Sequence, residues 1–141
     1  MMRILFSLLI LLVSSFGLSA QSDSLLTVKI SGIESSKGHV LVALYDNATD
    51  WTKPDVALYS REAPASEGSM LIEFAHLAPG EYSIAALHDA DDSGNMTFSA
   101  FGLPKEVYGF SNDARGVFSA PSYESCMFKF GRSGMISFSL K

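Results

Sequence analysis

Apolar and polar residues alternate along most of the chain after residue 20, and this period of two predicts β-strands. The first two predicted strands cover residues 26–30 and 40–44, and a polar turn containing Gly38 separates them. We therefore expect these two strands to pair as a hairpin. Four further strands are predicted by the same pattern. They cover residues 69–77, 82–88, 127–130 and 135–140, with a hairpin-length turn at 131–134 between the last two.

Six or seven short strands separated by turns, with no helical stripe, predict an all-β sandwich with Greek-key connections. Two longer irregular segments, Asp46 to Ala65 and Asp89 to Ser125, interrupt the pattern. Long irregular segments in a small domain are commonly functional. Within the first of them, residues 51–60 are compatible with a turn of helix or with a short edge strand, and the sequence does not decide between the two.

The first twenty residues have the features of a secretory signal peptide. Met1 to Arg3 is a short basic region, Ile4 to Val13 is almost entirely apolar, and small residues follow up to Ala20. The apolar run is shorter than the roughly 18 residues that a membrane-spanning helix needs. We therefore predict a signal peptide over 1–20 and a single exported domain over 21–141. This domain would be periplasmic or secreted, with no transmembrane segment after cleavage.

Composition narrows the class of protein further. The 141 residues are 48% hydrophobic and 18% charged, which argues against disorder, and the net charge of −5 argues against nucleic acid as a partner. The one cysteine excludes a disulfide framework within the chain and any multi-cysteine metal site. Residues 125–130 alternate like a strand, so we expect Cys126 to be a small buried hydrophobic residue.

An acidic turn directly after His88 is the strongest candidate for chemistry. Oxygen-bearing side chains stand at alternate positions and a glycine follows, as at the start of an EF-hand calcium loop. The predicted metal ligands are Asp89, Asp91, Ser93 and Asn95. The twelfth position, Ala100, cannot complete such a loop, so Glu106 or Asp113 would have to do so. Calcium is the cofactor that this loop would hold, and the alternative is a turn whose side chains cap its own backbone.

The acidic turn belongs to a longer pattern. His88-Asp89 and the turn through Gly94 are followed by Gly102-Leu103-Pro104-Lys105-Glu106 and Tyr108-Gly109-Phe110-Ser111-Asn112. This combination resembles the exported bacterial family catalogued as domain of unknown function 2141, over nearly all of residues 25–141. The resemblance implies an immunoglobulin-like or transthyretin-like β-sandwich and no established activity. Relative to the family pattern, Asp91 and Ser93 replace the usual asparagines and Thr97 replaces a commonly acidic residue.

The second half of that pattern offers a candidate ligand surface formed by Glu106, Tyr108, Phe110 and Asn112. Aromatic rings beside polar groups suit a sugar or a peptide, whereas large aromatic side chains more commonly pack structurally. The sequence favours the structural reading and leaves the other open.

These observations predict a non-enzymatic binding or structural module whose partner is an envelope protein or a glycan. One alternative is a carbohydrate-binding module that uses exposed Trp51, Tyr108 and Phe110. Another is an envelope hydrolase that uses His88 with Asp89 as an acid–base pair. We assign no catalytic residues, because the chain contains no nucleophile motif.

Overall fold

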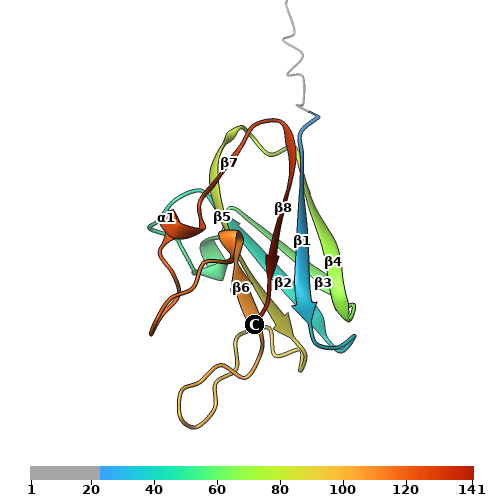
Figure 1. Cartoon of the computed structure of the whole chain (residues 1–141), viewed down its shortest axis with the longest axis vertical. Helices are drawn as coiled ribbons and strands as arrows, with labels where there is room; N and C mark the ends of the chain where they lie inside the picture. Colours follow the sequence, from blue (N-terminus) through green and yellow to red (C-terminus); the bar gives the residue numbers. More distant parts are fainter. Residues whose placement is uncertain (1–22) are drawn as a thin grey trace, which may run out of the picture.

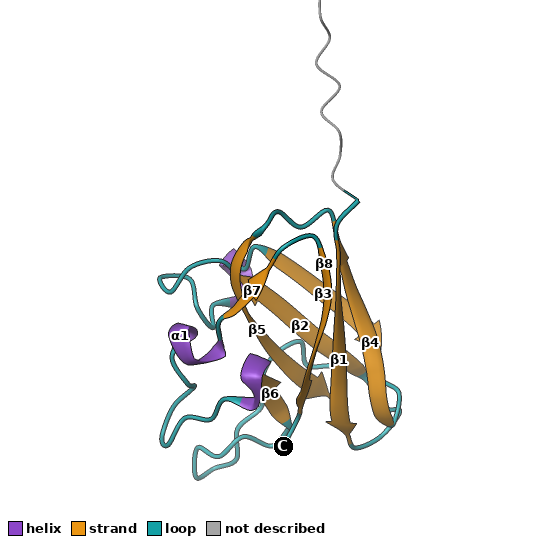
Figure 2. Cartoon of the chain, turned by 45° about the horizontal axis from the view of Figure 1, so that its top comes forward, coloured by secondary structure: helices purple, strands orange, loops and turns teal. Residues whose placement is uncertain are grey.

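The computed structural model describes residues 23–141, so the predicted signal peptide over 1–20 lies outside the described residues. The described part is nearly all β, as predicted, with short helical turns on one side (Figure 2). It contains eight strands: β1 (Leu25–Ile33), β2 (His39–Tyr45), β3 (Tyr59–Pro64), β4 (Gly68–Ala75), β5 (Gly80–Asp89), β6 (Tyr108–Phe110), β7 (Phe128–Phe130) and β8 (Ser133–Ser139). Two 3₁₀ helices, at Pro54–Val56 and Ser111–Asp113, and one α-helix, α1 (Tyr123–Cys126), complete it. No helix in this part of the chain is long and apolar enough to cross a membrane.

The strands form two sheets that enclose one core (Figure 1). The first sheet has the order β4-β1-β8, with β1 antiparallel to β4 and parallel to β8. The second has the order β3-β2-β5-β6. β6 pairs with residues 85–87 of β5, and β7 pairs with residues 80–82 of the same strand. Backbone hydrogen bonds between Tyr108 and Lys141 join β6 to the chain end that follows β8, at 3.0 and 3.4 Å.

The predicted period of two fixes which side chains are buried. Alternate residues of strands from both sheets pack between them: Leu26, Val28, Ile30, Val40, Val42, Leu44, Ile72, Phe74, Ile84, Ala86 and Phe138. Burial of these apolar side chains is the main source of the fold's stability.

Both predicted hairpins are wrong. β1 and β2 lie in different sheets, and β7 pairs with β5 whereas β8 pairs with β1. Alternation shows which face of a strand is buried, but the inner faces of two opposed sheets are equally apolar. A chain that crosses from one sheet to the other therefore buries the same residues as a hairpin would, and the sequence pattern cannot separate the two.

The irregular segments contain short elements that the pattern did not resolve. Residues 51–60 include both alternatives that the sequence left open, since the 3₁₀ helix Pro54–Val56 precedes the edge strand β3. Cys126 is buried as predicted, but it ends helix α1, which Ser122 caps, and does not lie in a strand. Burial raises the pKa of the Cys126 thiol to about 11.

Candidate functional site: an acidic turn beside an apolar groove

The acidic turn begins where β5 ends, at the buried residue Asp89. One carboxylate oxygen of Asp89 accepts the backbone N–H of Ser93 at 3.0 Å, and the other accepts that of Gly94 at 2.7 Å. These bonds satisfy backbone donors inside the turn, as an aspartate-capped turn does. Asp89 therefore shapes the start of the long segment between β5 and β6.

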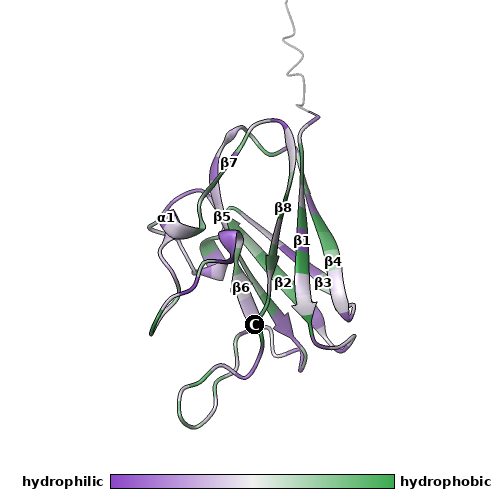
Figure 3. Ribbon diagram, viewed as in Figure 1, coloured by the Kyte–Doolittle hydropathy of each residue, from purple (hydrophilic) through white to green (hydrophobic). Residues whose placement is uncertain are grey.

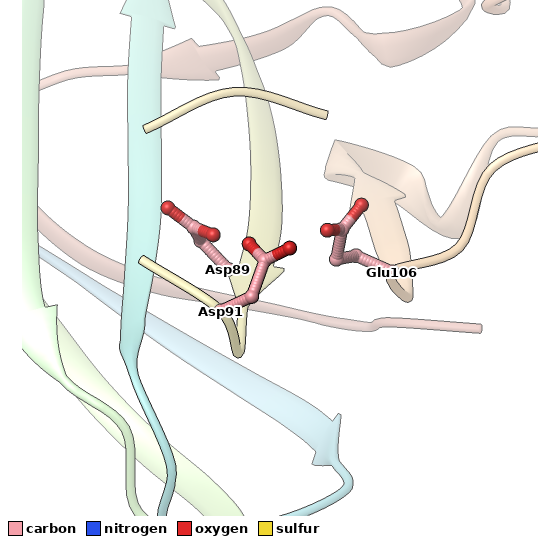
Figure 4. Close-up of side chains that lie close together, drawn as sticks. All are labelled: Asp89, Asp91 and Glu106. Atoms are coloured by element: carbon pink, nitrogen blue, oxygen red, sulfur yellow. The ribbon is translucent and has the colours of Figure 1, made fainter. Parts of the chain in front are cut away.

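Two further carboxylates approach Asp89 (Figure 4). Oxygen atoms of Asp89, Asp91 and Glu106 all lie within 4.8 Å of one another. Calcium binds oxygen ligands at about 2.3–2.6 Å, so one ion can contact oxygens separated by this distance. Hydrogen bonding from Ser93 holds the pKa of Asp91 below its usual value, which favours the charged form. The three side chains therefore have the donor type and the spacing that a hard cation needs.

Glu106 reaches the cluster because of the register between β5 and β6. Leu87 pairs with Tyr108, and the N–H of His88 donates to the Val107 carbonyl at 3.0 Å. Continuing this register places Glu106 across from Asp89. One Glu106 oxygen also accepts the N–H of Thr97 at 2.7 Å, which ties the returning strand to the loop.

The other predicted metal ligands have different surroundings. The Ser93 hydroxyl lies 3.3 Å from an Asp89 oxygen and donates to the Asn95 carbonyl at 2.8 Å. Asn95 is exposed and lines the groove described below. Asp113, the alternative to Glu106 for completing the loop, instead accepts the backbone N–H of Ser139 at 2.8 Å. Of the sequence-predicted ligands, the structure thus brings together Asp89 and Asp91, with Glu106 as the third carboxylate.

Within the segment Gly109 to Asn112, the side chains of Ser111 and Asn112 form hydrogen bonds that join elements distant in the sequence. The fully buried Ser111 hydroxyl accepts the N–H of Ile84 at 2.9 Å and donates to the Cys126 carbonyl. The Asn112 amide donates to the carbonyls of Ser125 and Met127 at 3.2 and 2.9 Å. Asn112, predicted as a ligand contact, therefore holds the chain after α1, and Ser111 is a structural residue that the sequence analysis missed.

The outer face of the second sheet carries a groove that the sequence analysis also missed. Its floor consists of the half-buried Leu41 and Ala43 from β2 and Ala85 and Leu87 from β5. The register arranges these residues in two rows across the sheet. One row consists of Leu41, Leu87 and Tyr108 of β6, and the other of Ala43, Ala85 and Phe110 of β6. The sequence contained a signal for this groove, because the middle of β2 and of β5 is apolar on both faces, with Leu41, Ala43, Ala85 and Leu87 between the core-facing residues.

Two loop segments flank the floor and give the groove a volume of about 970 Å³. One belongs to residues 94–104, between β5 and β6, and the other to residues 116–120, before α1. Figure 3 shows hydrophobic positions along the loop that follows β5 and extends beyond the sheets. The most exposed apolar side chains lining the groove come from these segments: Phe98, Leu103, Val117 and Phe118.

An aromatic cluster packs at one end of the floor, and two of its members, Tyr45 and Phe110, line the groove. The Trp51 ring contacts Tyr45, Phe110 and Tyr123 at centroid distances of 5.2–5.9 Å, and its N–H donates to the Pro121 carbonyl at 2.8 Å. Trp51 and Tyr108 are half-buried, and Phe110 is buried. The three aromatics predicted for carbohydrate binding therefore lie together, but as a packed cluster rather than as an open platform.

His88 and Asp89 lie on opposite faces of β5. The buried His88 side chain faces the core, where Nε2 donates to the Lys37 carbonyl at 2.8 Å, whereas Asp89 lies on the outer face with the groove. The two side chains share no cleft, so this geometry does not provide the acid–base pair of the hydrolase alternative.

The described chain is thus a two-sheet β-domain with an acidic turn at the end of one strand and an apolar groove on its outer face. Residues 28–137 match the family described as an uncharacterized protein conserved in bacteria (DUF2141). The chain belongs to this family, in agreement with the resemblance seen in its motifs. No curated protein and no solved structure matches the chain.

Proposed function

We propose that this protein is an exported, non-enzymatic binding module that takes a ligand into the groove on the outer face of its second sheet. The observation that carries the proposal is the apolar floor of this groove. Sheets that face water on one side ordinarily have polar residues there, but Leu41, Ala43, Ala85 and Leu87 occupy these positions. Ligand sites are typically concave and mostly apolar, with volumes of about 300–1,000 Å³.

The first test of this proposal is binding of a neutral apolar fluorophore, N-phenyl-1-naphthylamine, to residues 21–141. We expect saturable binding that Ala43→Gln weakens, because the amide would place polar atoms on the apolar floor. Ser137→Gln, on an exposed position of the other sheet, is the matched control. Equal binding by the wild-type protein and Ala43→Gln would refute the groove as the site.

The proposal includes a calcium ion at Asp89, Asp91 and Glu106 that holds the loop forming one wall of the groove. Support comes from the convergence of the three carboxylates and from the absence, in residues 23–141, of any lysine or arginine ion-paired with them. Extracellular modules bind calcium with Kd on the order of 10⁻⁴–10⁻³ M. At 10 mM calcium such a site would stabilise the native state by about 1.4–2.7 kcal/mol.

A calcium titration followed by the melting temperature tests this part. Asp91→Asn is the informative variant, because Asp91 is exposed and its loss removes a charge with little packing. Asp55→Asn, which removes an exposed carboxylate from the 3₁₀ helix outside the cluster, is the matched control. We expect a saturable rise in wild type and in Asp55→Asn, and its loss in Asp91→Asn. An equal rise in all three proteins would contradict the site.

Export and the finer fold class belong to the same proposal. Expression of the whole chain in a bacterial host should yield a periplasmic or secreted protein whose N-terminus is Gln21. Recovery of an uncleaved, cytoplasmic chain would contradict export. The immunoglobulin-like or transthyretin-like Greek-key class is supported by the family pattern and by the crossing of successive strands between two sheets.

A further inference from the structure

The floor of the groove offers a ligand no hydrogen bonds. β2 pairs with β3 on one side and β5 on the other, and β5 pairs with β2 and β6, so the backbone groups of the central strands are already used. The four floor side chains are hydrocarbon. A sugar ring on this floor would leave hydroxyl groups desolvated without partners, which costs free energy. The body of the ligand that fits this floor is therefore a hydrocarbon chain or an aromatic ring.

The two ends of the groove differ in charge. The aromatic cluster around Trp51 packs at one end. At the other end, the next row of the sheet places Asp89 beside the last floor row, with Glu106 across from it by continuation of the register. Glu62 lies on the same side of the sheet, paired with Leu41 of the floor. Glu62 lines the groove, whereas Asp89 is buried and Glu106 lies outside the lining, so the acidity of this end comes from one carboxylate in the groove and two beside it.

Few positive charges offset this acidity. The groove lining includes one arginine, Arg61, and its guanidinium lies 5.3 Å from the Phe74 ring and donates to the Ser60 carbonyl at 3.0 Å. Phe74 belongs to the core, so Arg61 is directed away from the groove. His39 is the only described basic group ion-paired at this end, with Asp92 at 2.6 Å and Glu62 at 3.8 Å. In the calcium-free protein these carboxylates outnumber the one imidazole, and this excess attracts a positively charged group.

We propose that the groove of the calcium-free protein binds an amphipathic cation, whose hydrocarbon or aromatic body lies on the floor and whose amine or quaternary ammonium group lies at the acidic end, where it and calcium are alternative occupants. The inference deepens the proposed function and rests on the groove being a binding site. Charge complementarity selects the cationic amphiphile over neutral and anionic ones of the same chain length. The fully exposed Phe118 and the other apolar wall residues add contact surface on the sides of the chain.

The test compares decyltrimethylammonium, decanol and decanoate, which share a chain and differ in charge. Each is titrated below its micelle concentration, in chelator-treated buffer, as a competitor of bound N-phenyl-1-naphthylamine. We expect the cation to bind roughly tenfold more tightly than decanoate at low ionic strength, and this preference to shrink in 0.5 M salt. Glu62→Gln should reduce the preference without abolishing binding, whereas Glu73→Gln, an exposed carboxylate of the first sheet, should leave it unchanged.

Three results would overturn the inference. Equal affinity for all three amphiphiles would show that charge does not select the ligand, while fluorophore binding would still support the proposed function. Failure of all three to displace a fluorophore whose binding Ala43→Gln weakens would refute the inference and leave the proposed function standing. A dimer in solution that Phe118→Ser converts to a monomer would assign the groove to a second copy of the chain. Because Phe118 and Glu62 are exposed, both variants are expected to fold, and circular dichroism checks this.

Discussion

Replacing Ser111 by alanine should destabilise the fold more than its small change in volume suggests. The hydroxyl is completely buried and joins two backbone groups, the N–H of Ile84 and the carbonyl of Cys126. Alanine fills nearly the same space but leaves both groups without a partner. An unsatisfied buried polar group costs about 1–3 kcal/mol, so the two together give a loss of about 2–6 kcal/mol.

Urea denaturation at pH 7 measures this loss in the free energy of unfolding, and alanine substitutions at two further serines provide comparisons. Ser83→Ala removes one buried bond, to the Tyr123 carbonyl, and should cost about 1–2 kcal/mol. Ser137→Ala, on an exposed position of β8, should change the free energy of unfolding by less than about 0.5 kcal/mol. If Ser111→Ala proved no more destabilising than Ser137→Ala, the stabilising role of the two buried Ser111 hydrogen bonds would be refuted.

Three other positions give independent predictions. Gly109→Ala should lower the free energy of unfolding by about 1–3 kcal/mol, because a Cβ there would lie 2.5 Å from the Ser139 carbonyl oxygen; unchanged urea stability would contradict this. The pKa of His39 is raised, and its hydrogen bond to Asp92 is the largest cause. The pairing therefore stabilises the fold at pH values below the unfolded pKa of His39, and this stabilisation is lost as pH rises through the folded pKa. An NMR titration should therefore give a His39 pKa above 6.5 that falls in Asp92→Asn, and equal values in the two proteins would count against the pairing. With its pKa raised to about 11 by burial, Cys126 should react with a thiol reagent at pH 8 at least about a hundredfold more slowly than in urea-unfolded chain, and equal rates would disprove its burial.

The sequence determined the buried faces of the strands because alternation follows directly from strand geometry. Ile72 and Phe74 of β4 and Ile84 and Ala86 of β5 face the core as their spacing predicted. Which strand pairs with which depends on contacts between distant segments, and β1 joins β8 across more than 100 residues. Local turn residues such as those around Gly38 carry no information about that pairing.

The candidate site was predictable to a similar degree. The acidic turn was visible in the spacing of Asp89 and Asp91, and Glu106 was identified as one of two carboxylates able to complete it and as part of the candidate ligand surface. Its convergence with them depends on the register of β6, which is three residues long. The groove was overlooked because alternation identifies the core-facing residues of each strand, and Leu41 and Leu87 occupy positions between them.

The central claim is that the outer face of the second sheet is the binding surface, and amide chemical shifts test it most directly. Uniformly ¹⁵N-labelled residues 21–141 would be titrated with N-phenyl-1-naphthylamine and followed by two-dimensional NMR. We predict that the largest shift changes fall on residues 41–43, 85–87 and 108–110, where the floor of the groove lies. Changes confined to β1, β4 and β8, or none at saturating fluorophore, would contradict the account.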